Sequence, residues 1–270
     1  MKQYNLSINV GNWQASLQVN LWEGSQELMA KQRPMILICP GGGYRIVSDR
    51  EADPVAAQFF AMGYHTAVLR YSVSPARYPT ALLQLAGAVK LIRENAAEWM
   101  VDSKKILVNG YSAGGHLAAS LGVFWKKEIL KDFYKCDSEC FRPNGLILSY
   151  PVISSGEFAH RGSFEKLLGE GEKEPGKEMS LEMQVNKDVP ITFLWHTDGD
   201  DTVPVENSVM FYSALHREGI PAELHIFQKG GHGLSTADKL AQNADGYGIQ
   251  PECQCWIPMV HTWIESNFGK

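Results

Sequence analysis

The stretch Gly110-Tyr111-Ser112-Ala113-Gly114-Gly115 joins two segments of different character. The mainly apolar segment 105–109 before it is typical of a buried strand, and segment 116–121 after it is rich in helix-forming residues. A serine at the tip of a strand, a sharp turn and a helix is the context of a nucleophile elbow. The helix N-terminus would also favour negative charge near Ser112. The stretch therefore makes Ser112 a candidate nucleophile, although a serine that only caps the helix fits the same pattern.

The composition favours one enzyme-sized α/β domain. The chain has 270 residues, 44% of them hydrophobic, which suits a single domain over residues 1–270 with a sizeable core. Its formal net charge of −5 argues against general nucleic-acid binding. The N-terminal residues lack a signal-like apolar core, and no run approaches the roughly 18 apolar residues of a membrane span. We therefore expect a soluble, cytoplasmic protein without membrane association, although a chain trimmed of its signal would look the same.

The five cysteines give no framework for disulfides or zinc. Cys39 lies in an apolar run and is expected in the core, and Cys253 and Cys255 lie near the C-terminus. An odd count without C-x-x-C pairs argues against both kinds of site. A bridge between Cys136 and Cys140 remains open, although a reducing cytosol disfavours it.

Strand-like and helix-like segments alternate along the chain. One or two antiparallel edge strands are expected within 1–22, and further strands over 35–39, 66–71, 105–109, 145–150, 191–196 and 222–227. Helices are expected over 53–62, 79–100, 205–218 and 257–268. This alternation predicts an α/β fold, with a mostly parallel central sheet and helices on both faces. Residues 152–189 turn polar and are expected to form a small cap-like insertion that includes the charged segment 170–178.

The strand over 35–39 ends in Pro40-Gly41-Gly42-Gly43-Tyr44. Consecutive glycines free the backbone to turn its N–H groups inward, and the carboxyl ends of strands in α/β sheets carry the sites. We expect an oxyanion hole formed by the N–H groups of Ala113 and of Gly42 or Gly43, rather than a merely flexible loop.

A serine nucleophile needs a base and a group that orients the base. Of the eight histidines, His232 follows the last strand between glycines and is the expected base, whereas His196 is expected to shape the loop that follows it. Three acids share that loop, at Asp198, Asp200 and Asp201, and turn formation or helix capping accounts for those that do not pair with the imidazole. Asp201 or Thr202 is expected to cap the next helix, which leaves Asp200 free to reach His232.

Together these motifs resemble the α/β-hydrolase fold family, and within it small acetyl esterases and lipase-like enzymes related to acetylxylan and feruloyl esterases. The resemblance spans nearly the whole chain and rests on the segments 40–44, 71–73, 110–118, 150–152, 200–204 and 231–233. Its spacing also points to Asp200, four residues before Pro204. The resemblance implies no metal and no organic cofactor. Pro40 departs from it, because many relatives have histidine there.

The function that this resemblance implies is serine esterase chemistry on short-chain carboxylic esters, with O-acetyl groups on sugars or xylan fragments as the expected substrates. Tyr44, Tyr150 and Trp195 are candidates for a wall on which a sugar stacks, although Trp195 fits the core equally well. Two alternatives remain: a serine peptidase of the prolyl-oligopeptidase type, and a hydrolase-fold binding protein without activity. The sequence predicts no oligomeric state.

Overall fold

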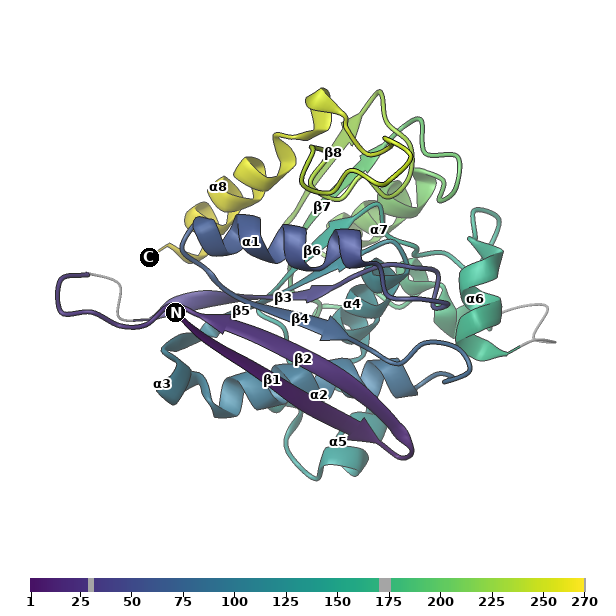
Figure 1. Cartoon of the computed structure of the whole chain (residues 1–270). Coiled ribbons are helices and arrows are strands. Elements are labelled where there is room, and N and C mark those ends of the chain that lie inside the picture. The colour runs from purple at the N-terminus through teal and green to yellow at the C-terminus, as the bar shows by residue number, and fades with distance from the viewer. Residues whose placement is uncertain (29–31, 170–175, 270) are drawn as a thin grey trace.

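The computed structural model describes residues 1–28, 32–169 and 176–269. Eight strands form one sheet in the order β1-β2-β4-β3-β5-β6-β7-β8 (Figure 1). Their bounds are β1 Lys2–Val10, β2 Trp13–Leu21, β3 Arg33–Cys39, β4 His65–Arg70, β5 Val101–Tyr111, β6 Gly145–Ser149, β7 Ile191–Thr197 and β8 Ala222–Phe227. Strands β1, β2 and β4 pair antiparallel, and all other neighbours pair parallel. The expected α/β-hydrolase architecture is confirmed, with two antiparallel strands at the sheet edge.

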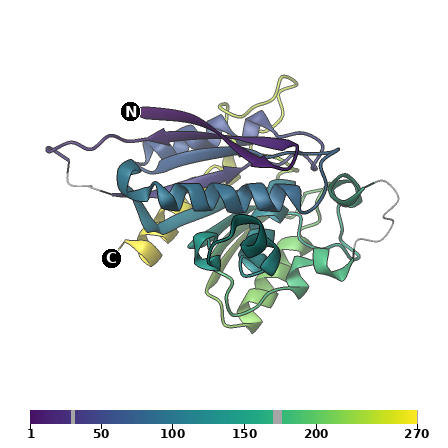
Figure 2. The same ribbon diagram turned by 90° about the horizontal axis from the view of Figure 1, so that it is seen from below.

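Helices cover both faces of the sheet (Figures 1 and 2). The helices are α1 Asp53–Ala61, α2 Thr80–Glu94, α3 Ala96–Trp99, α4 Ala113–Phe124, α5 Glu128–Tyr134, α6 Arg161–Leu168, α7 Glu206–Arg217 and α8 Trp256–Phe268. Short 3-10 turns lie at Asp49–Glu51, Ser138–Cys140, Lys177–Met179, Leu181–Met183 and Pro251–Cys253. One buried cluster joins α2, α4 and α7 to the sheet, and a second joins α1 and α8 to its other face. The central strands are apolar on both sides because both faces are covered.

The helix expected over 79–100 is divided in the structure. It ends at Glu94, and α3 begins at Ala96. The side-chain amide of Asn95 donates to the carbonyl oxygen of Leu91 at 2.8 Å, so this side chain takes up a helix-end acceptor and marks the break. The apolar periodicity continues across Asn95, which is why the sequence pattern alone does not show the division.

The insertion over 152–189 contains α6 and two 3-10 turns, and Figure 1 shows α6 beside the carboxyl ends of the strands. Residues 170–175 of its charged segment lie outside the described residues. The five cysteines are free thiols. Among the helices that the structure describes, none has the length and apolar character needed to cross a bilayer. The organisation of residues 1–270 as a single domain stays a prediction.

Candidate active site

Ser112 occupies a sharp turn between β5 and α4. Its backbone has φ +52° and ψ −120°, a conformation that is strained for a residue with a Cβ. The neighbouring glycines make the turn possible: a Cβ on Gly110 would lie 2.4 Å from the carbonyl oxygen of Gly114, and one on Gly114 would lie 2.1 Å from that of Cys39. The amide of Ser112 donates to Ser149 O at 3.1 Å. The chain is thus held in the geometry of a nucleophile elbow, with the Ser112 hydroxyl presented at the carboxyl end of the sheet.

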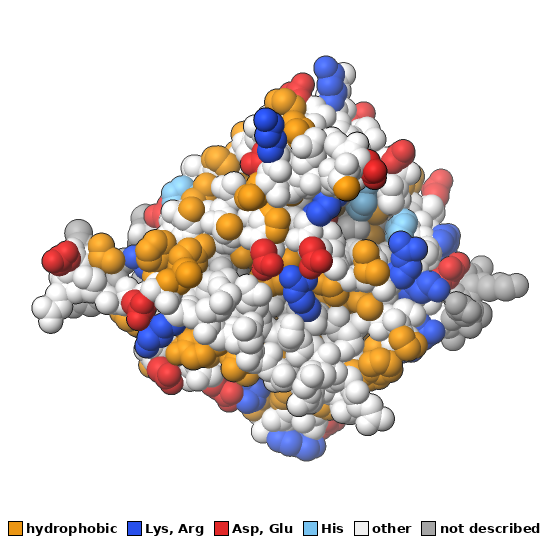
Figure 3. All heavy atoms as spheres, in the orientation of Figure 1, with side chains coloured by type: hydrophobic (Ala, Val, Ile, Leu, Met, Phe, Trp, Pro, Cys, Tyr) orange, Lys and Arg blue, Asp and Glu red, His pale blue; other side chains and the backbone are white. Residues whose placement is uncertain are grey.

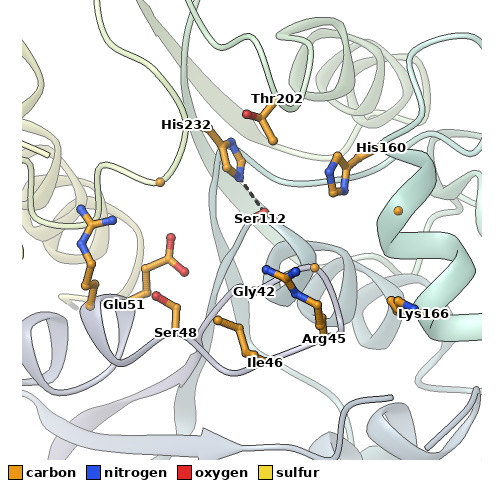
Figure 4. A pocket seen from close by; sticks show the side chains of 14 residues that line it. Gly42, Arg45, Ile46, Ser48, Glu51, Ser112, His160, Lys166, Thr202 and His232 are labelled. Carbon is orange, nitrogen blue, oxygen red and sulfur yellow. Dashed lines mark hydrogen bonds between the residues drawn. The ribbon is translucent and has the colours of Figure 1, made fainter. Parts of the chain in front are cut away.

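The structure brings Ser112, His232 and Asp200 together. The Ser112 Oγ lies 2.7 Å from His232 Nε2, and His232 Nδ1 lies 2.7 Å from Asp200 Oδ2 (Figure 4 draws the first of these). The loops that carry the acid and the base meet at Gly199, where a Cβ would lie 2.9 Å from Gly230 O. A hydroxyl, an imidazole and a carboxylate connected in this order can transfer a proton from the serine to the histidine.

Asp200 is buried and accepts several hydrogen bonds. Its Oδ1 accepts the N–H groups of Thr202 at 3.0 Å and Val203 at 2.9 Å, and its Oδ2 lies 3.2 Å from His196 Nε2. Burial would raise the pKa of the Asp200 carboxyl, but the hydrogen bonds from His196 and His232 outweigh it and hold the pKa well below its usual value. The orienting acid is therefore a stable carboxylate in this structure.

The other two acids of the loop lie away from the imidazole hydrogen bond. Asp201 is exposed, and its carboxylate contacts the Thr202 hydroxyl at 3.3 Å. The expectation that Asp201 or Thr202 caps the next helix is wrong: α7 begins at Glu206, and its N-terminus has no side-chain cap. Pro204 lies before the helix. The turn that precedes Pro204 is stabilised by Asp200, which accepts the backbone N–H groups of Thr202 and Val203. His196, as expected, braces this loop, with Nε2 3.0 Å from Val203 O and Nδ1 2.8 Å from Ser208 Oγ.

The glycine loop lies beside Ser112. Gly42 adopts φ +124°, and a Cβ there would lie 2.2 Å from Ile46 O, so only glycine fits. Within the described part of the chain, the N–H groups of Gly42, Gly43 and Ala113 have no hydrogen-bond acceptor. Gly42, Gly43 and Ser112 line one cavity. Unused backbone donors beside a nucleophile are what an oxyanion hole requires.

A buried carboxylate ties this loop to the base. Glu51 accepts the N–H of Gly41 at 2.8 Å and the hydroxyl of Tyr150 at 2.7 Å. The same Tyr150 oxygen accepts the N–H of Ser235, three residues after His232, at 2.9 Å. The Tyr150 ring packs edge-on against the His232 imidazole, with the centroids 5.1 Å apart. Glu51 and Tyr150 therefore position the glycine loop and the loop that carries His232 relative to each other.

The expected stacking wall is wrong. Tyr44, Tyr150 and Trp195 are 3%, 1% and 0% exposed, and none of them lines the cavity beside Ser112. Tyr44 hydrogen-bonds through its hydroxyl to His116 Nδ1 at 3.0 Å, and Trp195 donates to Ser149 Oγ at 2.7 Å while stacking on Trp256. Their rings lie in the core beneath the site, where they pack against other aromatic rings and use their polar atoms in buried hydrogen bonds.

The cavity has a volume of about 550 Å³. Sequence patterns did not identify much of its lining, which includes Arg45, Ile46, Arg50, His160, Lys166 and Thr202 (Figure 4). His160 and Lys166 come from the 152–189 insertion, so this segment forms part of the site. Burial, followed by the nearby charge of His232, lowers the pKa of His160, which favours its neutral form. The only sequence signal for this part of the lining was the polar insertion 152–189, which follows strand β6. Among the described residues, no group of three or more His, Cys, Asp or Glu is placed to hold a metal ion.

Known proteins resemble this chain in sequence and in fold. The BD-FAE family model matches residues 25–215. The chain is 36% identical over 212 residues to an endo-1,4-beta-xylanase B of Butyrivibrio fibrisolvens, covering 77% of this chain and 33% of the relative. It is 28% identical over 202 residues to an acetylxylan esterase of Xylanibacter ruminicola, covering 72% and 40%. It therefore spans well under half the length of these two curated relatives.

A solved structure matches over nearly the full length of both chains. It is an acetyl ester-xyloside bifunctional hydrolase from Caldicellulosiruptor lactoaceticus, with 35% identity and a TM-score of 0.80 over 95% of this chain and 89% of that one. The family match covers well over half of the present chain, and it includes the elbow and the glycine loop. The chain belongs to the BD-FAE family of α/β-hydrolase esterases.

Proposed function

We propose that this protein hydrolyses short-chain carboxylic esters, with O-acetyl groups on sugars or xylan fragments as its substrates. The observation that carries the proposal is the hydrogen-bonded chain from Asp200 through His232 to Ser112, with 2.7 Å at each step, placed beside unused backbone N–H groups. The names of the acetylxylan esterase and the acetyl ester-xyloside hydrolase among the relatives support the acetyl and sugar parts of the proposal.

In this mechanism Ser112 Oγ attacks the ester carbonyl carbon while His232 Nε2 accepts the hydroxyl proton. Asp200 holds the imidazole in the required tautomer and stabilises the imidazolium that forms. The N–H groups of Ala113 and of Gly42 or Gly43 stabilise the oxyanion. The intermediate then expels the alcohol, which takes the proton from His232, and the acyl-enzyme remains. Water attacks the acyl-enzyme with His232 as base, and the carboxylic acid leaves as Ser112 regains its proton.

The cavity favours a small acyl group and a polar alcohol. Most of its lining side chains end in polar or charged groups, and its apolar surface comes from Ile46 and from the aliphatic stems of side chains such as Arg45 and Lys166 rather than from a deep apolar pocket. Each buried CH₂ contributes about 0.8 kcal/mol only where an apolar pocket receives it. We therefore expect 4-nitrophenyl esters to be hydrolysed with kcat/KM falling steeply beyond about four acyl carbons. Equal or better rates on longer chains would reveal an apolar tunnel that the described residues do not show.

The decisive experiment combines covalent labelling with acetate release. The protein is treated with a fluorophosphonate probe and assayed on acetylated xylo-oligosaccharides, 4-nitrophenyl acetate and a chromogenic peptide amide, with Ser112→Ala as the matched control. Labelling at Ser112 and acetate release that the substitution abolishes are the expected results. Unlabelled protein without turnover would indicate a silent hydrolase fold, and faster cleavage of the amide would indicate a peptidase.

A further inference from the structure

Cationic side chains gather around the mouth of the cavity. Arg45 and Arg50 come from the loop that follows the glycines, and Lys166 comes from α6 in the insertion (Figure 4 labels Arg45 and Lys166). Figure 3 shows blue side chains gathered beside histidines on the part of the surface next to α6. The chain as a whole carries a net charge of −5, so this concentration of positive charge is local.

The carboxylate in the cavity lining does not pair with these cations. Glu51 is 4% exposed, and its two oxygens accept the Gly41 N–H and the Tyr150 hydroxyl. Asp200, also close to the site, is engaged by His232 and by the backbone of its own loop. Glu51 and Asp200 are therefore occupied in holding the loops around Ser112.

The two arginines have no carboxylate partner among the described residues. Arg50 donates through Nε to Ala241 O at 2.6 Å and lies over the Tyr247 ring, and its buried Nη2 has no acceptor. Arg45 is exposed and makes no ion pair within the described ranges. By contrast, Arg70 on the adjacent strand β4 pairs with Asp49 at 2.6 Å and with Asp53 at 3.5 Å. Arg45 therefore presents an exposed guanidinium group in the cavity lining with which no described carboxylate pairs.

We propose that the cavity selects esters whose alcohol half carries an anionic group, such as the carboxylate of a uronic acid, and that Arg45 recognises that group. This inference rests on the proposed esterase function and names its substrate class. A guanidinium group presents a planar set of donors that matches the oxygens of a carboxylate or a phosphate. Positive charge around a concave site also raises the local concentration of anionic ligands and their rate of association.

Arg45 is the better residue for a charge test. Arg50 also holds a backbone carbonyl, so replacing it would disturb the fold of its loop. The substrates are three mono-acetylated methyl glycosides that share one ring and one ester position: the glucoside, the glucuronide and the glucoside 6-phosphate. Wild type, Arg45→Gln and Arg217→Gln are compared by kcat/KM for each substrate. Arg217 is an exposed arginine on α7 outside the cavity lining, so its variant makes the same change in net charge at a distance.

We expect the wild type to prefer at least one anionic substrate over the glucoside by about tenfold at low salt, with the preference falling as salt is added. Arg45→Gln should reduce this ratio by about two- to fivefold, the upper part of the range for an exposed ion pair. Arg217→Gln should leave the ratio unchanged. The larger of the carboxylate and phosphate ratios identifies the preferred anion.

Two results would overturn the inference without touching the esterase proposal. One is turnover of the glucoside at least as fast as that of both anionic substrates, and the other is an anion preference that Arg45→Gln leaves intact. Hydrolysis of 4-nitrophenyl acetate serves as the independent measure of the esterase. If that reaction and fluorophosphonate labelling of Ser112 are both absent, the proposed function fails, and this inference fails with it.

Discussion

Two parts of the cavity are built in different ways. The floor consists of the glycine loop 40–44 and the elbow 110–115, and it is closely packed at most of its glycines. A Cβ on Gly42 or Gly114 would lie 2.2 or 2.1 Å from a carbonyl oxygen, whereas Gly43, which faces the insertion, has its nearest neighbour at 3.8 Å. The wall, which consists of the described part of the 152–189 insertion, is open. A Cβ on Gly162 of α6 would lie 3.8 Å from its nearest neighbour. Backbone sterics therefore fix the position of Ser112, whereas the wall contributes side chains that could be exchanged without a backbone clash.

His116 connects the floor to the wall. Its Nδ1 hydrogen-bonds to the Tyr44 hydroxyl at 3.0 Å, and its Nε2 lies 3.3 Å from Met179 O in the insertion. Burial lowers the pKa of His116 to about 4, so the imidazole is neutral at pH 7 and each ring nitrogen has one defined hydrogen-bonding role. The wall is thus anchored to the floor through a neutral, buried bridge.

The largest effect on kcat should come from replacing Asp200, the acid that orients His232. Asp200→Asn places an amide where His232 Nδ1–H needs an acceptor, and we expect kcat on 4-nitrophenyl acetate to fall by about 10³- to 10⁴-fold. Asp201→Asn changes an exposed neighbour and should lower kcat by less than about twofold, because surface substitutions usually have small effects. Steady-state kinetics of both variants measure this difference. The reverse pattern would make Asp201 the triad acid.

The next effect compares one glycine of the floor with one of the wall. Gly114→Ala forces a methyl group against the Cys39 carbonyl and should lower the free energy of unfolding by about 3 kcal/mol or more. Gly162→Ala adds the same methyl group in open space within a helix and should change stability by about 0.5 kcal/mol at most, or raise it. Urea unfolding measures both values. Similar losses at the two positions would remove the distinction between a rigid floor and an open wall.

The floor was largely predictable from the sequence. Glycines at 42, 110 and 114 and the strand-to-helix change around Ser112 have a direct steric meaning, and the last strand with its glycine-flanked histidine indicates where the base lies. The wall was not predictable in the same way. His160 and Lys166 reach the cavity only because α6 folds back over the strand ends, and no periodicity in a polar insertion encodes that position. The predicted stacking wall of Tyr44, Tyr150 and Trp195 was wrong for a related reason. An aromatic residue that is close to the site in sequence fits the core beneath the site equally well.

A third effect concerns the pH dependence of stability. The folded-state pKa of Asp200 lies below its ordinary value, so its ionised form stabilises the fold fully above the unfolded-state pKa, about 3.9, and this contribution is lost as the pH falls toward the folded-state pKa. The difference in unfolding free energy between wild type and Asp200→Asn should therefore be constant from pH 6 to about 5 and shrink from about pH 4 downward. Urea unfolding at stepped pH measures it. A difference that grows on acidification would show that the carboxylate is destabilised in the fold.

The smallest effect tests the wall. The imidazole of His160 uses Nδ1 to hydrogen-bond with Ser163 Oγ at 2.7 Å, and its pKa is lowered by burial and by the charge of His232. A neutral ring that lines the cavity beside Ser112 has Nε2 left for a hydroxyl of the alcohol half (Figure 4). One neutral hydrogen bond contributes about 0.5–1.5 kcal/mol, so His160→Asn should lower kcat/KM on acetylated sugars by about 2- to 12-fold, mainly through KM.

A matched pair of substrates and variants separates this role from a structural one. 4-Nitrophenyl acetate has no hydroxyl groups, so its kcat/KM should change less with His160→Asn than that of the acetylated sugar. His216, an exposed histidine on α7, provides the control variant His216→Asn, which should alter neither value. An equal loss on both substrates would mean that His160 supports the triad, and it would then belong functionally to the floor. A loss of kcat/KM confined to the acetylated sugar would show that the insertion recognises the alcohol half of the substrate, while the floor carries out the chemistry on any small acyl group.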